Sequence, residues 1–133
     1  MKRIAGVGIA AAVIVISGSA GSASAATGVC IDDRAALFYN SNLGGAFHCF
    51  MESGVSDYAG YKFDYAQGGT GGENGFLQPL KNNAASVDNT LNSRAYRVYY
   101  NSNYAGVYQT IGSHSWANLN SSLKNENASG RNI

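Results

Sequence analysis

Charged residues are scarce in this chain. Lys, Arg, Asp and Glu make up 13% of its 133 residues, about half of the roughly 25% found in a typical soluble domain. Low charge is common in membrane proteins, but here the apolar residues gather at the N-terminus and no second long apolar run follows. The formal net charge is +1, so the chain lacks the basic surface that binds nucleic acid or anionic lipid. We expect neither partner.

Residue types that carry catalysis or bind metals are also few. His48 and His114 are the two histidines; they cannot form a three-histidine zinc site, and no HExxH motif occurs. Ser113 precedes His114, but a hydrolytic triad is defined by spatial geometry rather than by neighbouring positions. No pair of carboxylates has the pattern of a glycosidase. We expect a non-enzymatic protein without a cofactor.

Two cysteines, Cys30 and Cys49, allow a single intramolecular disulfide. They lack the CxxC spacing of a redox or metal site, so we expect this bond to be structural. An oxidising compartment would favour it.

The first 25 residues have the three parts of a secretory signal peptide: basic Met1-Lys2-Arg3, apolar Ile4–Ile16 and the small residues Ala23-Ser24-Ala25. The alternative is a retained anchor, but the apolar run is short for spanning a bilayer. Cleavage after Ala25 would leave residues 26–133, with seven basic against eight acidic residues. We expect a secreted, extracellular monomer, free of the membrane after processing.

The remaining chain contains an internal repeat. Residues 80–89 align without gaps to residues 123–132, with six identities, and residues 38–47 align in the same way to residues 99–108. Two blocks that recur in the same order indicate a duplicated unit. The blocks are offset by different amounts, which places 18 extra residues of the first copy within residues 51–79.

Short aromatic segments separated by Gly and Asn predict an all-β sandwich. We expect strands at Ala36–Tyr39 and Tyr96–Tyr100, with return strands at Ala46–Phe50 and Val107–Ile111. The one candidate for helix is Trp116–Leu123, which would form one or two turns.

In both copies an aromatic residue is followed after six positions by Gly, and a Ser comes later in the copy. This pattern resembles the βγ-crystallin fold, in which two Greek-key motifs form one domain. The resemblance implies motif 1 at about residues 30–92 and motif 2 at about residues 93–133. The structural residues that it implies are Phe38, Gly45, Ser86, Tyr99, Gly106 and Ser129.

A narrower resemblance is to the Streptomyces metalloproteinase-inhibitor family of exported proteins. The matching blocks are Leu37–Gly45 and Asn82–Val87. This resemblance implies a peptidase inhibitor and an extracellular protease as partner. No cysteine follows Cys49, so the disulfide-held reactive loop of that family's namesake has no counterpart here.

The best candidate for an inhibitory loop is therefore the glycine-rich stretch of the extra segment. Five of its eight residues are glycine, which excludes a regular strand or helix. The residues are Gly68, Gly69, Thr70, Gly71, Gly72, Glu73, Asn74 and Gly75.

The crystallin resemblance also raises calcium as a ligand. The candidate oxygen donors are Asn82, Asn83, Ser86, Asn125, Glu126 and Ser129. Lys81 and Lys124 stand where that family's pattern has an acidic or amide residue, and Ala85 and Ala128 replace a hydroxyl. Because hard cations need several oxygen ligands, we regard calcium as a doubtful cofactor. A calcium-stabilised structural domain and an antimicrobial or toxin-type protein are the alternatives to the inhibitor.

Overall fold

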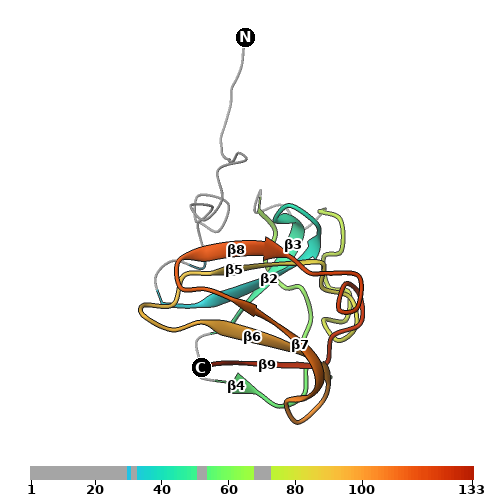
Figure 1. The fold of residues 1–133 in the computed structure, drawn as a ribbon. Coiled ribbons are helices and arrows are strands. Elements are labelled where there is room, and N and C mark those ends of the chain that lie inside the picture. Colours follow the sequence, from blue (N-terminus) through green and yellow to red (C-terminus); the bar gives the residue numbers. More distant parts are fainter. Residues whose placement is uncertain (1–29, 31–32, 51–53, 68–72) are drawn as a thin grey trace.

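The structure is a computed structural model that describes residues 30, 33–50, 54–67 and 73–133. The expected signal peptide and its cleavage site lie outside these residues. Within these described residues, eight strands form two four-stranded antiparallel sheets that pack face to face (Figure 1). Within the described part of the chain, no helix is long and apolar enough to cross a membrane.

The strands follow the duplication. The first copy contributes β2 (Ala35–Asn40), β3 (Gly44–Phe50), β4 (Gly54–Val55) and β5 (Ser86–Asn89). The second copy contributes β6 (Tyr96–Asn101), β7 (Ala105–Ile111), β8 (Ser115–Asn118) and β9 (Ser129–Asn132). All four strands expected from the sequence are confirmed.

The two copies exchange one strand each. The sheets have the orders β3-β2-β5-β8 and β4-β9-β6-β7, so the third strand of each copy pairs in the sheet of the other. Each sheet is complete only with a strand from the other copy. The expected two-Greek-key β-sandwich is therefore confirmed.

The main core lies between the sheets and is built by alternate residues of each strand. Leu37 and Val87 of one sheet face Tyr96 and Val98 of the other, and all four are buried. A second cluster covers the outer face of the first sheet, where Cys30, Phe38, Leu43 and Phe47 are buried and Trp116 packs against them.

The two aromatic-to-glycine hairpins have matching backbones. Gly45 and Gly106 adopt φ of 76° and 83°. A Cβ at these positions would meet the side-chain amide of Asn40 at 2.9 Å or of Asn101 at 2.8 Å. Glycine is needed here both for the positive φ and for the close approach of the asparagine.

The candidate helix at Trp116–Leu123 is not formed. Its first half is strand β8, paired with β5 along its whole length. Its second half is a single turn, in which the N–H groups of Leu123 and Lys124 both donate to Asn120 O. Because β8 is needed to complete the sheet, its pairing decides the conformation of a segment whose local pattern is ambiguous.

Candidate functional site

The two expected closing serines occupy equivalent positions. Ser86 Oγ donates to Asn40 O at 2.6 Å and accepts from Leu43 N at 3.0 Å. Ser129 Oγ donates to Asn101 O, also at 2.6 Å, and accepts from Tyr104 N at 3.0 Å. Each hydroxyl thus ties the last strand of its copy to the first hairpin of the same copy: β5 to the β2–β3 hairpin, and β9 to the β6–β7 hairpin.

The expected disulfide joins Cys30 to Cys49 on β3, with 5.7 Å between their Cα atoms. It holds the segment before β2 against the outer cluster, where Cys30 is buried. Neither cysteine is free for redox or metal chemistry.

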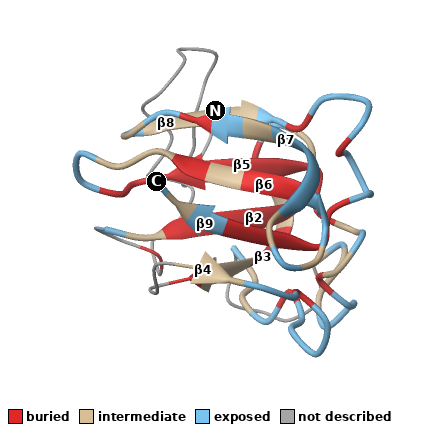
Figure 2. Ribbon diagram, turned by 60° about the horizontal axis from the view of Figure 1, so that its bottom comes forward, coloured by how far each residue is buried: buried red, intermediate tan, exposed pale blue. Residues whose placement is uncertain are grey.

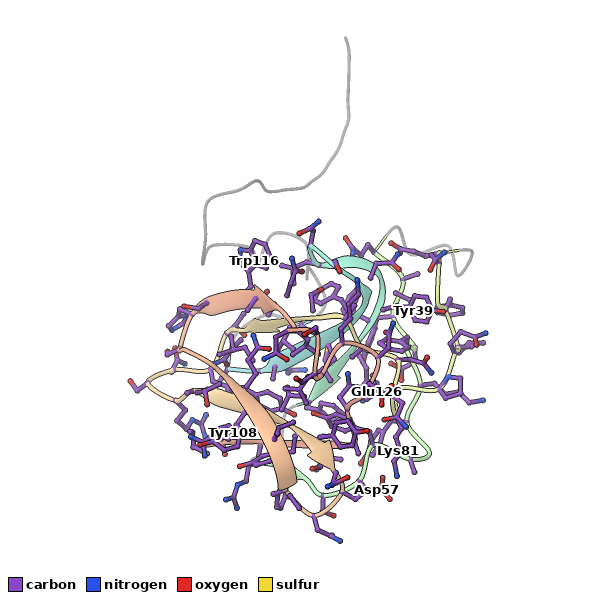
Figure 3. The ribbon with its side chains drawn as sticks, turned by 45° about the vertical axis from the view of Figure 1, so that its right-hand side comes forward. Tyr39, Asp57, Lys81, Tyr108, Trp116 and Glu126 are labelled. Carbon is purple, nitrogen blue, oxygen red and sulfur yellow. A yellow bond between two sulfur atoms is a disulfide. The ribbon has the colours of Figure 1, made fainter. Side chains whose placement is uncertain are left out.

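A lysine lies at the place where the resemblance puts a calcium ligand. The Lys81 Nζ atom is 2.9 Å from Asp57 Oδ1 and donates to Ser102 Oγ at 3.2 Å. Figure 3 shows Asp57, Lys81 and Glu126 on one side of the sandwich. Asn82 and Glu126 line a cavity of about 190 Å³ beside this lysine.

The Lys81 ammonium already neutralises the Asp57 carboxylate, which lies beside the candidate calcium site. The N–H of Ala59 and, second, the Lys81 ammonium hold the pKa of Asp57 below its usual value. A calcium ion would have to displace or approach this ammonium, and calcium prefers several charged oxygens. No group of three His, Cys, Asp or Glu residues that could hold a metal occurs in the described part of the chain. The residues present do not fit calcium.

The other calcium candidates have structural positions. Asn82 and Asn125 adopt left-handed φ of 64° and 59°, a conformation that Asn tolerates well. Their N–H groups donate to Asn127 O and Ala84 O respectively, across the two copies. Asn83 Nδ2 donates to Pro79 O at 2.8 Å. These asparagines shape the turns before β5 and β9.

The extra segment of the first copy folds into an irregular hairpin along β3. Residues 61–67 run outward and residues 73–80 return, which we call the insertion hairpin. Phe63 N donates to Gln78 O at 3.1 Å, and Leu77 N donates to Phe63 O at 2.8 Å. Phe63 and Leu80 are fully buried in the main core. The sequence predicted only a glycine-rich loop here.

The insertion hairpin is also bonded to the outer edge of β3. Phe47 and Tyr65 exchange two backbone hydrogen bonds of 2.9 and 3.0 Å, and their rings stack. Ala46 N donates to Asn74 O at 2.9 Å. The Asp64 carboxylate bonds His48 Nδ1 at 2.7 Å.

The candidate inhibitory loop divides into two parts. Residues 68–72 lie outside the described residues, so their part of the prediction is not addressed. On one side of them, Gln67 Nε2 donates to Leu43 O at 2.7 Å and to Gly45 O at 3.0 Å, and Gln67 N donates to the Glu73 carboxylate. On the other side, Gly75 adopts φ of 85°, with Tyr39 against its Cα. Both ends of the loop are therefore fixed.

An exposed apolar residue stands on this fixed hairpin. Leu77 is 52% exposed and adopts φ of 63°. A left-handed conformation costs a non-glycine residue roughly 1–2 kcal/mol. The buried neighbours Phe63 and Leu80 hold Leu77 in this outward position.

Sequence reasoning missed several buried polar residues. Asn89 Nδ2 donates to the carbonyls of Arg94, Ile111 and Gly112, at 3.0, 3.0 and 2.9 Å. Its identity with Asn132 in the repeat was the available signal. Tyr58 and Tyr96 bury their hydroxyls together at 3.2 Å, and nothing in the local sequence distinguishes Tyr58 from exposed Tyr61.

Comparison with known proteins addresses the fold alone. No protein-family model matches the sequence, and comparison with curated proteins gives no match. Among solved structures, a βγ-crystallin from an archaeon is 20% identical, with a TM-score of 0.52 over 77% of this chain and 100% of that one. The βγ-crystallin from Ciona intestinalis is 16% identical, with a TM-score of 0.52 over 75% of this chain and 99% of that one.

A βγ-crystallin domain from Flavobacterium johnsoniae is 17% identical, with a TM-score of 0.53 over 76% of this chain and 94% of that one. Identities this low support a shared fold, and a fold does not determine function. The chain therefore has the fold of βγ-crystallin domains.

Proposed function

We propose that this protein is an exported, non-catalytic peptidase inhibitor built on a βγ-crystallin-like scaffold. The observation that carries the proposal is the attachment of the insertion hairpin, which fixes residues 67 and 73–75 on either side of residues 68–72. An inhibitor gains affinity when the segment that enters the protease is already ordered, because less entropy is lost on binding.

The attachment has three independent components. Gln67 bonds two carbonyls of the β3 hairpin, Asn74 O accepts from β3, and Phe63 lies in the core. Loops held by a rigid scaffold carry binding functions more often than other surfaces. The described residues of this extra segment thus form an added structure that is bonded to β3 and packed on the core.

Leu77 provides a candidate anchor beside the loop. Binding energy in protein interfaces is concentrated in a few apolar or aromatic residues that enter pockets of the partner. An exposed leucine on strained, hydrogen-bonded backbone fits this role, because unusual backbone conformations are often retained at functional sites. The proposed partner is an extracellular protease that accepts an apolar side chain.

The test begins with the full chain expressed in an exporting host. N-terminal sequencing of the protein from the medium should begin at Ala26. This protein is then titrated against thermolysin-like metalloproteases and serine proteases. If the protein inhibits none of the proteases in the panel, the proposal is rejected.

Two variants locate the inhibitory surface. Deletion of residues 68–72 removes none of the residues that make the Gln67 and Asn74 contacts, and we expect it to abolish inhibition while the melting temperature shows that the fold persists. Leu77→Ala should raise the inhibition constant at least about tenfold, which corresponds to about 1.4 kcal/mol. Val107→Ala is the matched control, because Val107 is 57% exposed on β7, outside the insertion hairpin. Equal loss in Leu77→Ala and Val107→Ala would contradict this location.

A further inference from the structure

The outer edge of β3 in the first copy is covered, whereas the equivalent edge of β7 in the second copy is exposed. Phe47 and Tyr108 are equivalent, because Phe47 pairs with Phe38 and Tyr108 pairs with Tyr99 in matching registers. The insertion hairpin covers the β3 edge, so Ala46 and Phe47 are 0% and 1% exposed. The second copy has no such insertion, and Val107 and Tyr108 are 57% and 52% exposed. Figure 2 shows β7 as a largely exposed strand.

The backbone of β7 is also open at its outer side. In the register of the first copy, the N–H and C=O of Phe47 point away from β2 and bond Tyr65. The same register turns the N–H and C=O of Tyr108 away from β6. No backbone bond between described residues reaches either group. β7 is the edge strand of its sheet.

The sequence of β7 lacks two of the features by which edge strands avoid pairing, charged side chains and proline. Its seven residues, Ala105–Ile111, contain no charged side chain and no proline. Exposed, uncharged edge strands are templates for pairing with another chain. β7 has seven residues, as many as β3, whose edge the insertion hairpin covers, and more than the other two described edge strands, β4 and β8, which have two and four.

We propose that β7 pairs antiparallel with β7 of a second copy of this chain, about a twofold axis at Tyr108. A twofold interface places the same surface on both subunits. Tyr108 of one chain would then lie opposite Tyr108 of its partner chain, as Tyr65 lies opposite Phe47 at the covered edge. The partner chain thus supplies to β7 the same kind of partner that the insertion hairpin supplies to β3, an aromatic residue on an extended segment.

The flanking residues are compatible with this register. Val107 lies opposite Gln109 of the partner chain, and Gly106 lies opposite Thr110 of the partner chain. No two like charges of β7 therefore face each other. Arg97 lies on β6, with its guanidinium 4.1 Å from the centre of the Tyr108 ring. Each guanidinium lies at its Tyr108 ring, so the two Arg97 charges come near the axis, and their repulsion is screened over the Debye length of about 8 Å at physiological salt.

The interface is narrow, and this sets its strength. A single pair of strands buries less than the roughly 1,200 Å² of a standard stable interface. The dimer therefore forms in a concentration-dependent manner rather than as an obligate assembly. This assembly would replace the monomer expected from the sequence, and it is independent of the proposed inhibition.

Sedimentation of the protein recovered from expression of the full chain tests the assembly. The mass should rise toward that of two chains as concentration increases from micromolar to millimolar. Val107→Lys adds like charges on either side of the axis and should keep the protein monomeric over this range, with unchanged melting temperature. Leu77→Lys is the matched control and should dimerise like the wild type, because Leu77 has similar exposure but lies on the insertion hairpin.

A wild-type protein that stays monomeric at millimolar concentration would overturn the proposal. So would a Val107→Lys protein that still dimerises, or equal loss of dimer in Leu77→Lys, because either result places the contact elsewhere.

Cysteine substitution tests the register. Residues opposite each other as hydrogen-bonded pairs have Cα atoms about 5.5 Å apart, within the range of about 4.4–6.8 Å that a disulfide spans. Tyr108→Cys should therefore form an intermolecular disulfide on mild oxidation. Thr110→Cys is the control, since the two Thr110 residues would lie ~14 Å apart. Equal cross-linking of both variants would refute the axis at Tyr108.

Discussion

The hydroxyl of Ser86 offers the sharpest test of how the last strand of a copy stabilises the first hairpin of that copy. Ser86→Ala removes one oxygen and leaves the side-chain volume nearly unchanged. The hydroxyl is fully buried and forms two hydrogen bonds, to Asn40 O and from Leu43 N. Leu43 itself adopts a left-handed φ of 56°. Ser86 therefore stabilises a turn that a leucine does not favour.

The two lost bonds differ in cost because their surroundings differ. Leu43 is 5% exposed, so its N–H would be left buried without a partner, at about 1–3 kcal/mol. Asn40 is exposed, so water can replace the serine at its carbonyl, and this bond contributes about 0.5–1.5 kcal/mol. We expect Ser86→Ala to lower the free energy of unfolding by about 2–4 kcal/mol.

The duplication supplies an internal comparison. Ser129→Ala breaks the same two bonds in the second copy, but Tyr104, whose N–H bonds Ser129, is only half-buried. Water can reach this N–H, so the loss should be smaller, about 1–2 kcal/mol. The order of the two variants is therefore a prediction in itself.

Urea unfolding, followed by the fluorescence of the single tryptophan, Trp116, measures both losses. Ser121→Ala is the control, because Ser121 is exposed and such changes stay within about 0.5 kcal/mol. If Ser86→Ala costs no more than Ser121→Ala, the closing serines do not stabilise the hairpins, and the structural role assigned to them is wrong.

Three further predictions follow from other parts of the fold. Gly75→Ala should destabilise the protein by about 2–4 kcal/mol in urea unfolding, because a Cβ would lie 2.1 Å from the Tyr39 ring at a positive φ; an unchanged midpoint would contradict it. Burial raises the pKa of Tyr58 and of Tyr96, so stability is retained below the unfolded tyrosine pKa of about 10 and falls as pH rises above it, by about 1.4 kcal/mol per pH unit for each tyrosine. Tyr58→Phe should reduce this alkaline slope, and an unaltered slope would count against it. Millimolar calcium should leave the melting temperature equal to that in chelator, because a ligand of the folded state must raise it; a rise would show that the Lys81 ammonium does not exclude the ion.

Local pattern was sufficient for the fold wherever the two copies carry the same signal. Each hairpin has an aromatic residue, an Asn-containing turn and a glycine at positive φ, so the strands around Phe38 and Tyr99 could be predicted from either copy. The closing role of Ser86 and Ser129 came from the resemblance to the βγ-crystallin pattern, which both copies carry. A repeated pattern separates structural positions from chance similarity because two positions must satisfy the same geometry.

Prediction failed where tertiary pairing decides the conformation. Trp116–Leu123 has a weak helical pattern, but β5 needs an antiparallel neighbour and takes Ser115–Asn118 as β8. Tyr58 and Tyr61 stand three positions apart with similar neighbours, yet one is fully buried and the other is exposed. Their difference depends on Tyr96 and on the close approach of Gly130 to both buried rings, which belong to the second copy. No local property of the first copy contains this information.

The insertion hairpin explains why the two halves of a duplicated fold need not share one function. A duplicated sandwich begins with two equivalent edges, β3 and β7, and each exposes backbone groups that must be bonded to water or protein. In the first copy the added residues bond the β3 edge and bury Ala46 and Phe47. The same residues fix Gln67 and Asn74 on either side of residues 68–72, which is the basis for the proposed inhibition. The second copy keeps its edge open, and a second chain can bond β7 as the insertion bonds β3. One addition to one copy therefore creates a candidate binding loop on one side of the sandwich and leaves a pairing surface on the other.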